Sequence, residues 1–567
     1  VRRLRRGEPI EARAPTLGYQ VRLLARRHKA AFAAGGVVIA ALVAATVVSL
    51  RAAADAREQQ QVAERETERS RGMLRASQDA IGRMATEVFD QLAPLPGSLE
   101  TRRLMANVLD DALQGLTRNV GDDPELRRLA ARTATQLSRI YGAAAESNLG
   151  ETQRAIELQA RALAELEALG YRGYARVEAH MQMAGFRFAA GELDEALAES
   201  ERALALVDGM GDLTQPQMLD KASCLQERAH IMFALGRLDD ALAELAAARA
   251  IADALPESAG RDKLLSEVEG TLGHRLLNTG RRDEAAPHLR ASGEALDRMA
   301  AGLESPVPML TRRGLLAFRW GDLAAVNRRH DLAVEHFAEA ARLFREWLAL
   351  EPRDAKVRFL LALTLTRAGR AQSQLAKGAY RFALTLEEEP VKPGMAEAQK
   401  RYAGAIGFLR DAVAELRGMV EADPTRRKHG YALCEAMLDL SVALSRTKSF
   451  AEARTLLDEA GDMARGFESR SPGDAEAQRI VTWVAQKEGT YWVNLSDAQG
   501  TGGDFTSARA SLENAVERFT FARDRILATK GDRDTEAAQL TKLIAAYERF
   551  LARAPGGDAS GGEPEDR

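Results

Sequence analysis

An eightfold recurrence of one spacing constrains this chain more than any other feature. An alanine is followed by a variable or bulky residue four positions later and by a small residue seven positions later. The copies are Ala155/Gln159/Ala162, Ala196/Ser200/Ala203, Ala241/Leu245/Ala248, Ala285/Leu289/Ser292, Ala333/Phe337/Ala340, Ala405/Leu409/Ala412, Ala453/Leu457/Ala460 and Ala508/Leu512/Ala515. These three positions share one face of a helix, and the small residues allow a neighbouring helix to approach closely.

A residue suited to a tight turn precedes most of these segments. Five positions before the first alanine, six of the eight copies have a glycine or a lysine: Gly150, Gly191, Gly236, Gly280, Lys448 and Gly503. Glycine adopts left-handed backbone conformations at little cost, as a tight turn between paired helices requires. Because one helix pair cannot bury its own apolar face, we expect neighbouring pairs to stack into a solenoid.

These positions resemble the second helix of tetratricopeptide (TPR) repeats over residues 143–530. The resemblance implies a TPR-like α-solenoid whose concave face, lined by the first helices of the pairs, binds a protein or peptide. Successive first alanines are 41, 45, 44, 48, 72, 48 and 55 residues apart, against about 34 in the standard repeat. We therefore expect longer helices or inserted loops, and the longest gap, which contains residues 392–395, has room for a degenerate pair.

Composition indicates an all-α protein. Alanine is abundant, aromatic residues make up 5% of the 567 residues, and the net charge is −3. Alanine has the best helix propensity, and this charge gives no reason to expect a nucleic-acid partner. The two cysteines, Cys224 and Cys434, are expected to be small buried side chains rather than a disulfide framework.

Residues 30–50 form an uncharged run, AAFAAGGVVIAALVAATVVSL. As a helix this run would be about 31 Å long, close to the roughly 30 Å hydrocarbon core of a bilayer. Residues 1–29 contain nine Arg or Lys against two acids, which favours a cytoplasmic N-terminus. The sequence thus predicts a single-pass protein of the cell (inner) membrane, with residues 30–50 in the lipid bilayer and the repeats extracytoplasmic, rather than a cleaved signal peptide.

Breaks in pattern divide the chain further. Two prolines and a glycine interrupt the helical pattern at residues 92–98, and the C-terminal residues are rich in glycine and acids. The predicted order is a basic juxtamembrane segment (1–29), a transmembrane helix (30–50), a helical stalk (51–92), a helical connector (93–142), the TPR-like array (143–530), a terminal helix (531–554) and a disordered tail (555–567).

The sequence contains no motif that would identify an enzyme or a metal site. It lacks a phosphate-binding GxxxxGK[ST] loop, GxGxxG, HExxH, GxSxG and CxxC. His330 and His336 are six residues apart, which places them on different helix faces, and the acid clusters at 122–124 and 387–390 fit solvated helix boundaries. We therefore predict no catalytic, cofactor-binding or metal-binding residues, and no cofactor.

Residues 2–29, RRLRRGEPIEARAPTLGYQVRLLARRHK, carry a second resemblance. They resemble the segment after the catalytic domain of bacterial receptor-type serine/threonine protein kinases: residues 4–13 match its last helix and residues 16–28 its juxtamembrane piece. In one large group of that family, a single span then leads to TPR repeats, and the LPGS at 95–98 and NLGE at 148–151 also resemble that group. The kinase motifs would precede residue 1, and the initial Val fits a chain cut there, so no catalytic residue can be assigned.

Two functions remain open on these grounds. The chain is either the interaction or sensor region of a serine/threonine kinase receptor, lacking the catalytic domain, or a free-standing membrane-anchored TPR scaffold. Either would bind a protein or peptide on the concave face, and ligand binding or homodimerisation would transmit a signal in the first case. The adjacent Arg281 and Arg282 fit a solvated helix start better than a contact for an acidic peptide. The sequence does not identify the ligand-contacting residues.

Overall fold

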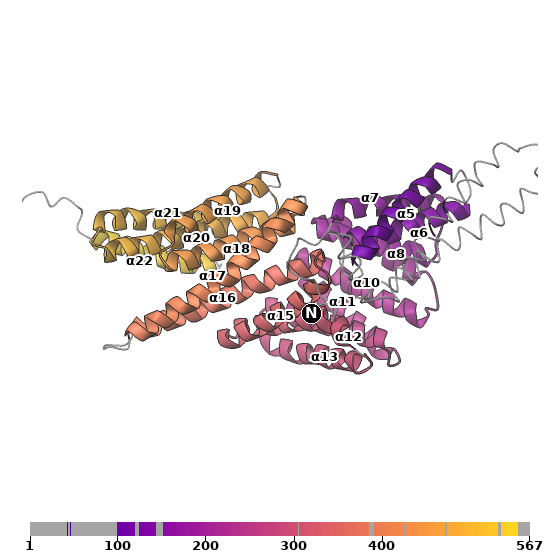
Figure 1. Ribbon diagram of the computed structural model, residues 1–567, viewed down its shortest axis with the longest axis horizontal. Helices are drawn as coiled ribbons and strands as arrows, with labels where there is room; N and C mark the ends of the chain where they lie inside the picture. Colours follow the sequence, from indigo (N-terminus) through magenta and orange to yellow (C-terminus); the bar gives the residue numbers. More distant parts are fainter. Residues whose placement is uncertain are drawn as a thin grey trace, which may run out of the picture. The chain divides into compact units, whose positions relative to one another are not determined.

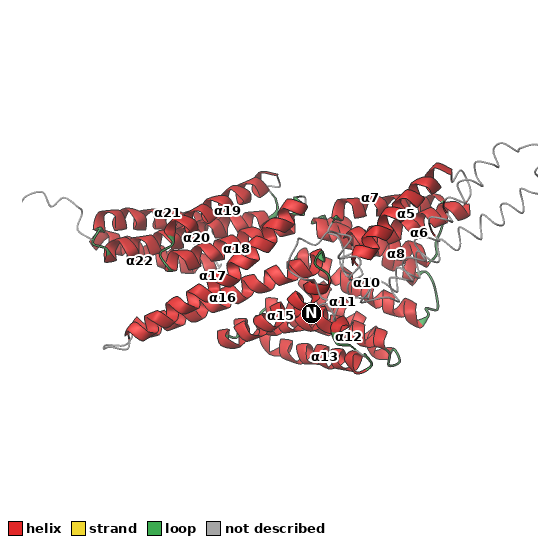
Figure 2. Ribbon diagram, viewed as in Figure 1, coloured by secondary structure: helices red, strands yellow, loops and turns green. Residues whose placement is uncertain are grey.

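A computed structural model gives the arrangement of the chain (Figure 1). The described residues form eighteen α-helices and one 3-10 helix, with no strand among them (Figure 2). These residues are 42, 46, 99–119, 124–142, 151–303, 305–384, 391–424, 426–470, 473–530 and 535–553. The predicted juxtamembrane segment, stalk and tail lie outside them, so the predicted domain boundaries remain predictions.

The chain divides into two compact units, which are considered separately. Unit 1 comprises Val1–Ala248 with Leu348–Lys356, and unit 2 comprises Arg249–Trp347 with Val357–Arg567. The helices of unit 1 are α5 (Leu99–Asn119), α6 (Pro124–Gly142), α7 (Thr152–Ala168), α8 (Tyr174–Ala190), α9 (Leu193–Asp208), α10 (Gln215–Ala234) and most of α11 (Leu238–Ala254).

Unit 2 contains the remaining helices, apart from the residues of α15 and α16 that fall within Leu348–Lys356. They are α12 (Ala259–Asn278), α13 (Arg282–Ala301), the 3-10 turn η1 (Val307–Met309), α14 (Leu310–Val326), α15 (His330–Leu350), α16 (Ala355–Leu384), α17 (Val391–Ala422), α18 (Arg427–Arg446), α19 (Phe450–Arg470), α20 (Ala475–Thr501), α21 (Phe505–Lys530) and α22 (Thr535–Arg553). Even-numbered helices from α6 to α20 are the first helices of pairs, and the odd-numbered helices that follow are the second.

The predicted repeat is confirmed in its packing. All three positions of all eight copies are buried, with no side chain more than 9% exposed. They lie on the second helices of the pairs, where the alanines allow close approach and the residue between them fills the interface. The all-helical, TPR-like arrangement of helix pairs is therefore the fold of the described chain.

The predicted turns are also confirmed where the structure describes them. Gly191, Gly236, Gly280, Gly503 and Lys448 all have positive φ angles, between 65° and 86°. At each, the following N–H reaches back to a carbonyl five residues earlier, closing the end of the first helix. The sixth predicted turn residue lies outside the described residues.

One turn of the same type was missed by the sequence pattern. Arg328 stands five residues before Ala333 and has φ 59°, and the N–H of Arg329 donates to the carbonyl of Ala324 at 2.8 Å. The backbone therefore imposes a left-handed residue at this point even though the side chain disfavours it.

Glycines on the first helices interlock with the second helices. A Cβ added at Gly273 would lie 2.7 Å from Leu289, one at Gly321 2.6 Å from Phe337, and one at Gly369 2.5 Å from Leu409. In each case the second-helix residue is the middle member of the repeated triplet. The bulky residue thus fits against a glycine of the paired helix, which explains why both can pack so closely.

The widest repeat spacing comes from longer helices rather than from an extra pair. Helices α16 and α17 have 30 and 32 residues and form one long hairpin (Figure 1). Residues 392–395 lie in the first turns of α17, where Pro393 removes no intrahelical hydrogen bond. The degenerate pair considered from the sequence is therefore absent between residues 355 and 422, apart from the undescribed 385–390.

The predicted single-pass inner-membrane location is contradicted. None of the helices in the described parts of the chain combines the length and the apolar character that crossing a bilayer would need. The physical reason is that each helix from α5 to α22 carries charged side chains. The predicted span and lipid contact at residues 30–50 lie outside the described residues, except for Leu42 and Thr46.

Candidate protein-binding surface

The interlocking glycines fix which side of each first helix faces away from its partner. A residue two positions before such a glycine lies about 160° around the helix, because each residue turns the helix by about 100°. In unit 2 these positions are Thr271 on α12, Arg319 on α14, Arg367 on α16 and Lys487 on α20, before Gly273, Gly321, Gly369 and Gly489.

Helix α18 contributes Glu435 to the same face. Its glycine, Gly430, contacts Phe467 of α19, and Glu435 lies about 140° from it. We call Thr271, Arg319, Arg367, Glu435 and Lys487 the first-helix row. Three of its five members are basic.

Ion pairs connect consecutive first helices along this row. His274 Nε2 lies 3.2 Å from Asp322 Oδ2, and Arg367 Nε lies 3.8 Å from Asp322 Oδ1, so that α12, α14 and α16 are joined. Arg370 of α16 then pairs with Glu435 and with Asp439 of α18, both at 2.6 Å.

These ion pairs, here called the polar ladder, continue to the end of the array. Lys487 Nζ on α20 lies 3.0 Å from Asp439 Oδ1 on α18. Gln486 donates to Glu536 of α22 at 2.8 Å. Six consecutive first-layer helices of unit 2 are therefore joined by polar contacts.

The anions of the ladder are more deeply buried than its cations. The side chains of Asp322, Glu435 and Asp439 are 13%, 20% and 10% exposed, whereas Arg367 and Arg370 are 44% and 31% exposed. The Lys487 side chain is 31% exposed, as much as that of Arg370. The outer surface of the ladder is consequently basic, although its charges nearly balance.

Asp439 is the electrostatic centre of the ladder. Burial alone would raise the pKa of its carboxyl group, but Arg370 and Lys487 hold that pKa well below its usual range. Burial would likewise lower the pKa of Arg370, and the two carboxylates raise it instead. Both shifts therefore favour the charged forms of Asp439 and Arg370.

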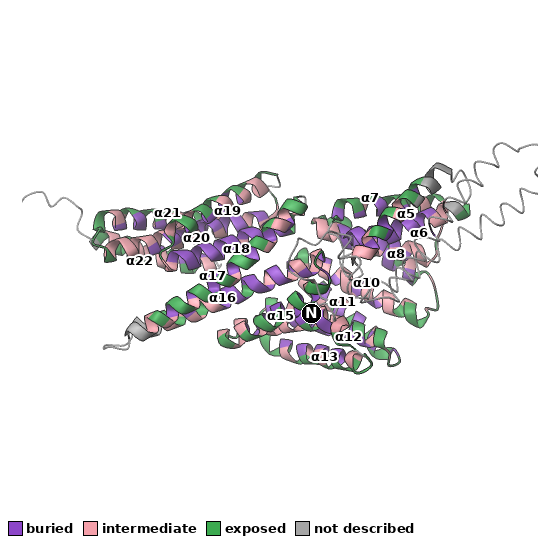
Figure 3. Cartoon of the chain, in the orientation of Figure 1, coloured by how far each residue is buried: buried purple, intermediate pink, exposed green. Residues whose placement is uncertain are grey.

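Helix α18 is enclosed on almost every side. Fifteen of its twenty residues are buried, and its turns are largely of the buried class in Figure 3. A buried carboxylate on such a helix needs charged partners, and Asp439 finds them on the helices to either side.

Arg319 occupies a different environment from the other row members. A Cβ at Gly270 of α12 would lie 1.9 Å from its Nη1, so the guanidinium rests against the bare backbone there. Its Nη2 is 3.5 Å from Thr271 Oγ1. Burial lowers the pKa of Arg319 to about 10, with Glu267 opposing and Arg275 adding to that shift.

The other candidates from the sequence have structural roles. Arg281 pairs with Glu284 at the start of α13, as a solvated helix start would. His336 packs on Trp320, and Cys224 and Cys434 are buried free thiols. Within the described residues, no group of three or more His, Cys, Asp or Glu could hold a metal ion.

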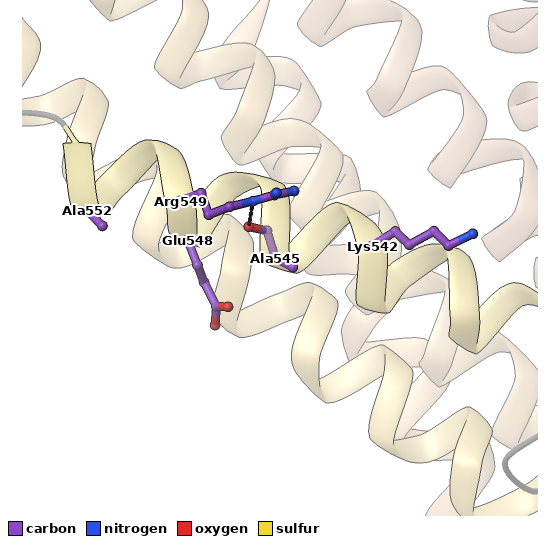
Figure 4. Close-up of a pocket in the computed structure, with 5 residues that line it drawn as sticks. All are labelled: Lys542, Ala545, Glu548, Arg549 and Ala552. Carbon is purple, nitrogen blue, oxygen red and sulfur yellow. Dashed lines mark hydrogen bonds between the residues drawn. The ribbon is translucent and has the colours of Figure 1, made fainter.

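A shallow depression on α22 brings no converging groups together. Lys542, Ala545, Glu548, Arg549 and Ala552 line it, and all belong to that single helix (Figure 4). Arg549 Nε donates to the carbonyl of Ala545 at 3.0 Å. The feature is an exposed helix face rather than a binding cleft.

The first-helix row was missed in the sequence, although a local signal exists. A basic residue stands two positions before a glycine in RWG (319–321), RAG (367–369) and KEG (487–489). These three tripeptides are short and unevenly spaced. Their meaning depends on knowing that each glycine faces a second helix.

Comparisons with known proteins do not assign the chain to a family. No family model matches the chain, and no curated protein matches it. Among solved structures, a Rap protein complexed with competence and sporulation factor covers 76% of this chain and 99% of its own at 13% identity, with a TM-score of 0.39. Yeast Tom70 covers 80% of this chain and 97% of its own at 15% identity, with a TM-score of 0.20.

A STAND-class signal transduction ATPase with a tetratricopeptide repeat sensor, from Pyrococcus horikoshii, is also similar. It covers 77% of this chain at 14% identity with a TM-score of 0.42, and this chain spans 55% of its length. Nothing in these comparisons shows the kinase relationship that residues 2–29 suggest. The chain is similar to helical-repeat proteins, and its own helix pairs are TPR-like.

Proposed function

We propose that this chain is a non-catalytic scaffold whose unit 2 binds a segment of a partner protein along the first-helix row. The observation that carries the proposal is the run of partly exposed basic side chains on the side of the first helices that faces away from the second helices. In stacked helix pairs that side is not used for packing within the pair, so it is the side on which a ligand can lie.

The dimensions of the row favour an extended chain over a small molecule. Helices that pack against one another are about 8–10 Å apart, so the distance from α14 to α20 is roughly 24–30 Å. An extended peptide advances about 3.3 Å per residue, so eight or nine residues would cover the row. Arginine is well suited to such a surface because it offers five donors and packs its stem on apolar neighbours.

A site-specific photo-crosslinking experiment tests this proposal. Gln374 is exposed on α16, about 140° from the contact glycine Gly369, and Ala414 is exposed on the paired helix α17. A photoreactive amino acid placed at Gln374 in the full-length chain should crosslink a partner protein in cells of the source organism. The same amino acid at Ala414 should not, and Arg367→Glu should abolish the product.

Equal crosslinking from both positions, or a product that survives Arg367→Glu, would show that the partner does not use the first-helix row. Arg410→Glu provides a matched charge reversal. Arg410 pairs with Glu452 at 2.8 Å between the second helices α17 and α19, so this change should leave the Gln374 product intact.

We infer further, from residues 2–29 alone, that this scaffold serves a serine/threonine protein kinase. The proposal is tested by the size of the native protein, detected with an antibody against residues 508–567. A native chain well above 61.7 kDa that carries kinase activity in the immunoprecipitate would support it. A native chain of 61.7 kDa without associated kinase activity would favour the free-standing scaffold.

A further inference from the structure

The position of Arg319 is built into the contact between α12 and α14. Its guanidinium occupies the space that a side chain at residue 270 would fill, and a Cβ at that position would also lie 3.0 Å from Ser292 Oγ. Glycine at this position in the interior of a helix costs about 0.5–1 kcal/mol relative to alanine. The absence of a side chain at Gly270 therefore lowers helix stability, and it leaves a notch that admits the Arg319 guanidinium.

The guanidinium has little compensation within the described parts of unit 2. Its hydrogen bond to Thr271 Oγ1 is long, at 3.5 Å. No carboxylate in the described parts of unit 2 lies within ion-pair distance of it. Asp322 and Glu267 on the same two helices have other basic partners: Asp322 pairs with His274 and Arg367, and Glu267, one turn before Thr271, lies 4.0 Å from Arg312.

An arginine cannot resolve this situation by losing its proton. Its pKa remains far above neutral even after the lowering caused by burial. A partly buried cation without a carboxylate is costly, and an anion that reaches it recovers much of that cost. The site therefore favours a negatively charged group from outside the chain.

The neighbouring row members have the same sign and a useful spacing. Arg367 lies on the next first helix, which is about 8–10 Å from α14, and its side chain is 44% exposed. Carboxylates three residues apart on an extended chain are about 10 Å apart. Two such side chains could reach Arg319 and Arg367 together, and charge-assisted bonds to arginine are the strong ones.

We propose that the first-helix row selects acidic segments, with the Arg319 guanidinium in the Gly270 notch as the subsite for a glutamate or aspartate side chain. This inference rests on the proposed function, because it names the chemistry of the segment bound there. The ligand group is a side-chain carboxylate within a chain, so a free C-terminus is not required.

Fluorescence anisotropy with defined peptides tests the inference on the full-length protein. The probe is a labelled, C-terminally amidated Gly/Ser peptide of about thirteen residues with glutamate at every third position. The control peptide has glutamine at those positions. We expect the glutamine peptide to bind at least tenfold more weakly, and salt to weaken the glutamate peptide. Equal binding of the two peptides would overturn the proposed selectivity.

Two variants separate the position of the arginine from its charge. Arg319→Gln should weaken the glutamate peptide at least tenfold. Gly270→Ala should do the same with the net charge unchanged, because the new Cβ would displace the Arg319 guanidinium, its other close neighbour being Ser292 Oγ at 3.0 Å. Arg417→Gln, which removes a pair with Glu459 between second helices, should bind as the wild type does.

Wild-type affinity in Arg319→Gln would refute the subsite. Circular dichroism and thermal unfolding show whether the variants are folded, and an unchanged or higher midpoint is expected for Arg319→Gln because a poorly compensated charge is removed. A fall in the midpoint together with a loss of binding would instead make Arg319 a structural residue. Crosslinking at Gln374 without glutamate selectivity would leave the scaffold in place and reject only this inference.

Discussion

The contact between Gly369 and Leu409 predicts that Gly369→Ala destabilises the wild-type protein but stabilises the Leu409→Ala variant. A Cβ at Gly369 would lie 2.5 Å from Leu409 Cγ and about 3 Å from both of its Cδ atoms. Alanine would gain up to about 1 kcal/mol over glycine in a helix interior, but overpacking a filled core costs about 1–3 kcal/mol. Gly369→Ala in the wild-type protein should therefore be destabilising by roughly 0–2 kcal/mol.

Leu409→Ala removes the obstructing side chain. Alone it should cost about 2–5 kcal/mol, because Leu409 is fully buried. In that background the new methyl group of Gly369→Ala would meet space instead of a side chain. Only the gain in helix propensity then remains, so the substitution should stabilise the protein. The double mutant should thus be more stable than Leu409→Ala alone, by up to about 1 kcal/mol.

Native-state hydrogen exchange of the full-length chain measures this effect where it arises. Long repeat arrays do not unfold as a single two-state unit, so the local opening free energy of α16 and α17 is the appropriate quantity. A gain of 1 kcal/mol appears as about a fivefold slower exchange. Gly378→Ala is the control, because nothing lies within 4 Å of a Cβ there, and it should be stabilising in both backgrounds.

The reasoning would be refuted if Gly369→Ala had the same sign in both backgrounds. A stabilising effect in each would mean that the two helices separate readily to accept a Cβ. A destabilising effect in each would mean that Gly369 is required for a reason other than its contact with Leu409.

Three further predictions concern charge and backbone. Asp439→Ala leaves two cations without their shared carboxylate and should lower the local opening free energy of α18, measured by native-state hydrogen exchange, by about 3–5 kcal/mol; Arg370 keeps Glu435, so the lower end is expected. Arg328→Gly and Lys448→Gly should raise the thermal midpoint, since each residue adopts a left-handed φ that costs a non-glycine residue about 1–2 kcal/mol, whereas Gly236→Ala should lower it. Burial, aided by Arg426 and Lys428, lowers the pKa of His429 to about 3; its contribution is complete above pH 6.5 and is lost as the pH falls toward 3, so His429→Phe should flatten that part of a pH–stability curve.

The second helices were predictable from the sequence because their constraint is local. An alanine, its partner four residues on and a small residue seven residues on must fall on one face, and the same three positions recur in every copy. The turn residues were predictable for the same reason, with the exception of Arg328. There the geometry of the turn overrides the preference of the side chain, which a search for glycine or lysine does not detect.

The first helices were harder to interpret because their surroundings are set by the fold. On α18, burial on almost every side removes the periodic contrast between apolar and polar positions. Its one deeply buried acid, Asp439, is paired with residues 69 positions before it and 48 positions after it. Such pairs are invisible to spacing rules, so the polar ladder and its basic outer surface emerge only when the helices are placed side by side.

In unit 2, the way each first helix is rotated about its axis determines both its packing and its proposed binding surface. The glycine that admits a bulky side chain from the second helix also determines, two residues earlier, which side chain faces away from that helix. In α14 and α16 that residue is an arginine, and in α20 it is a lysine. Because the two positions are separated by only two residues on a rigid helix, the contact that stacks each pair also fixes the direction of its basic residue. Three of the first helices of unit 2 thus present a cation on this side without any loop or separate binding element.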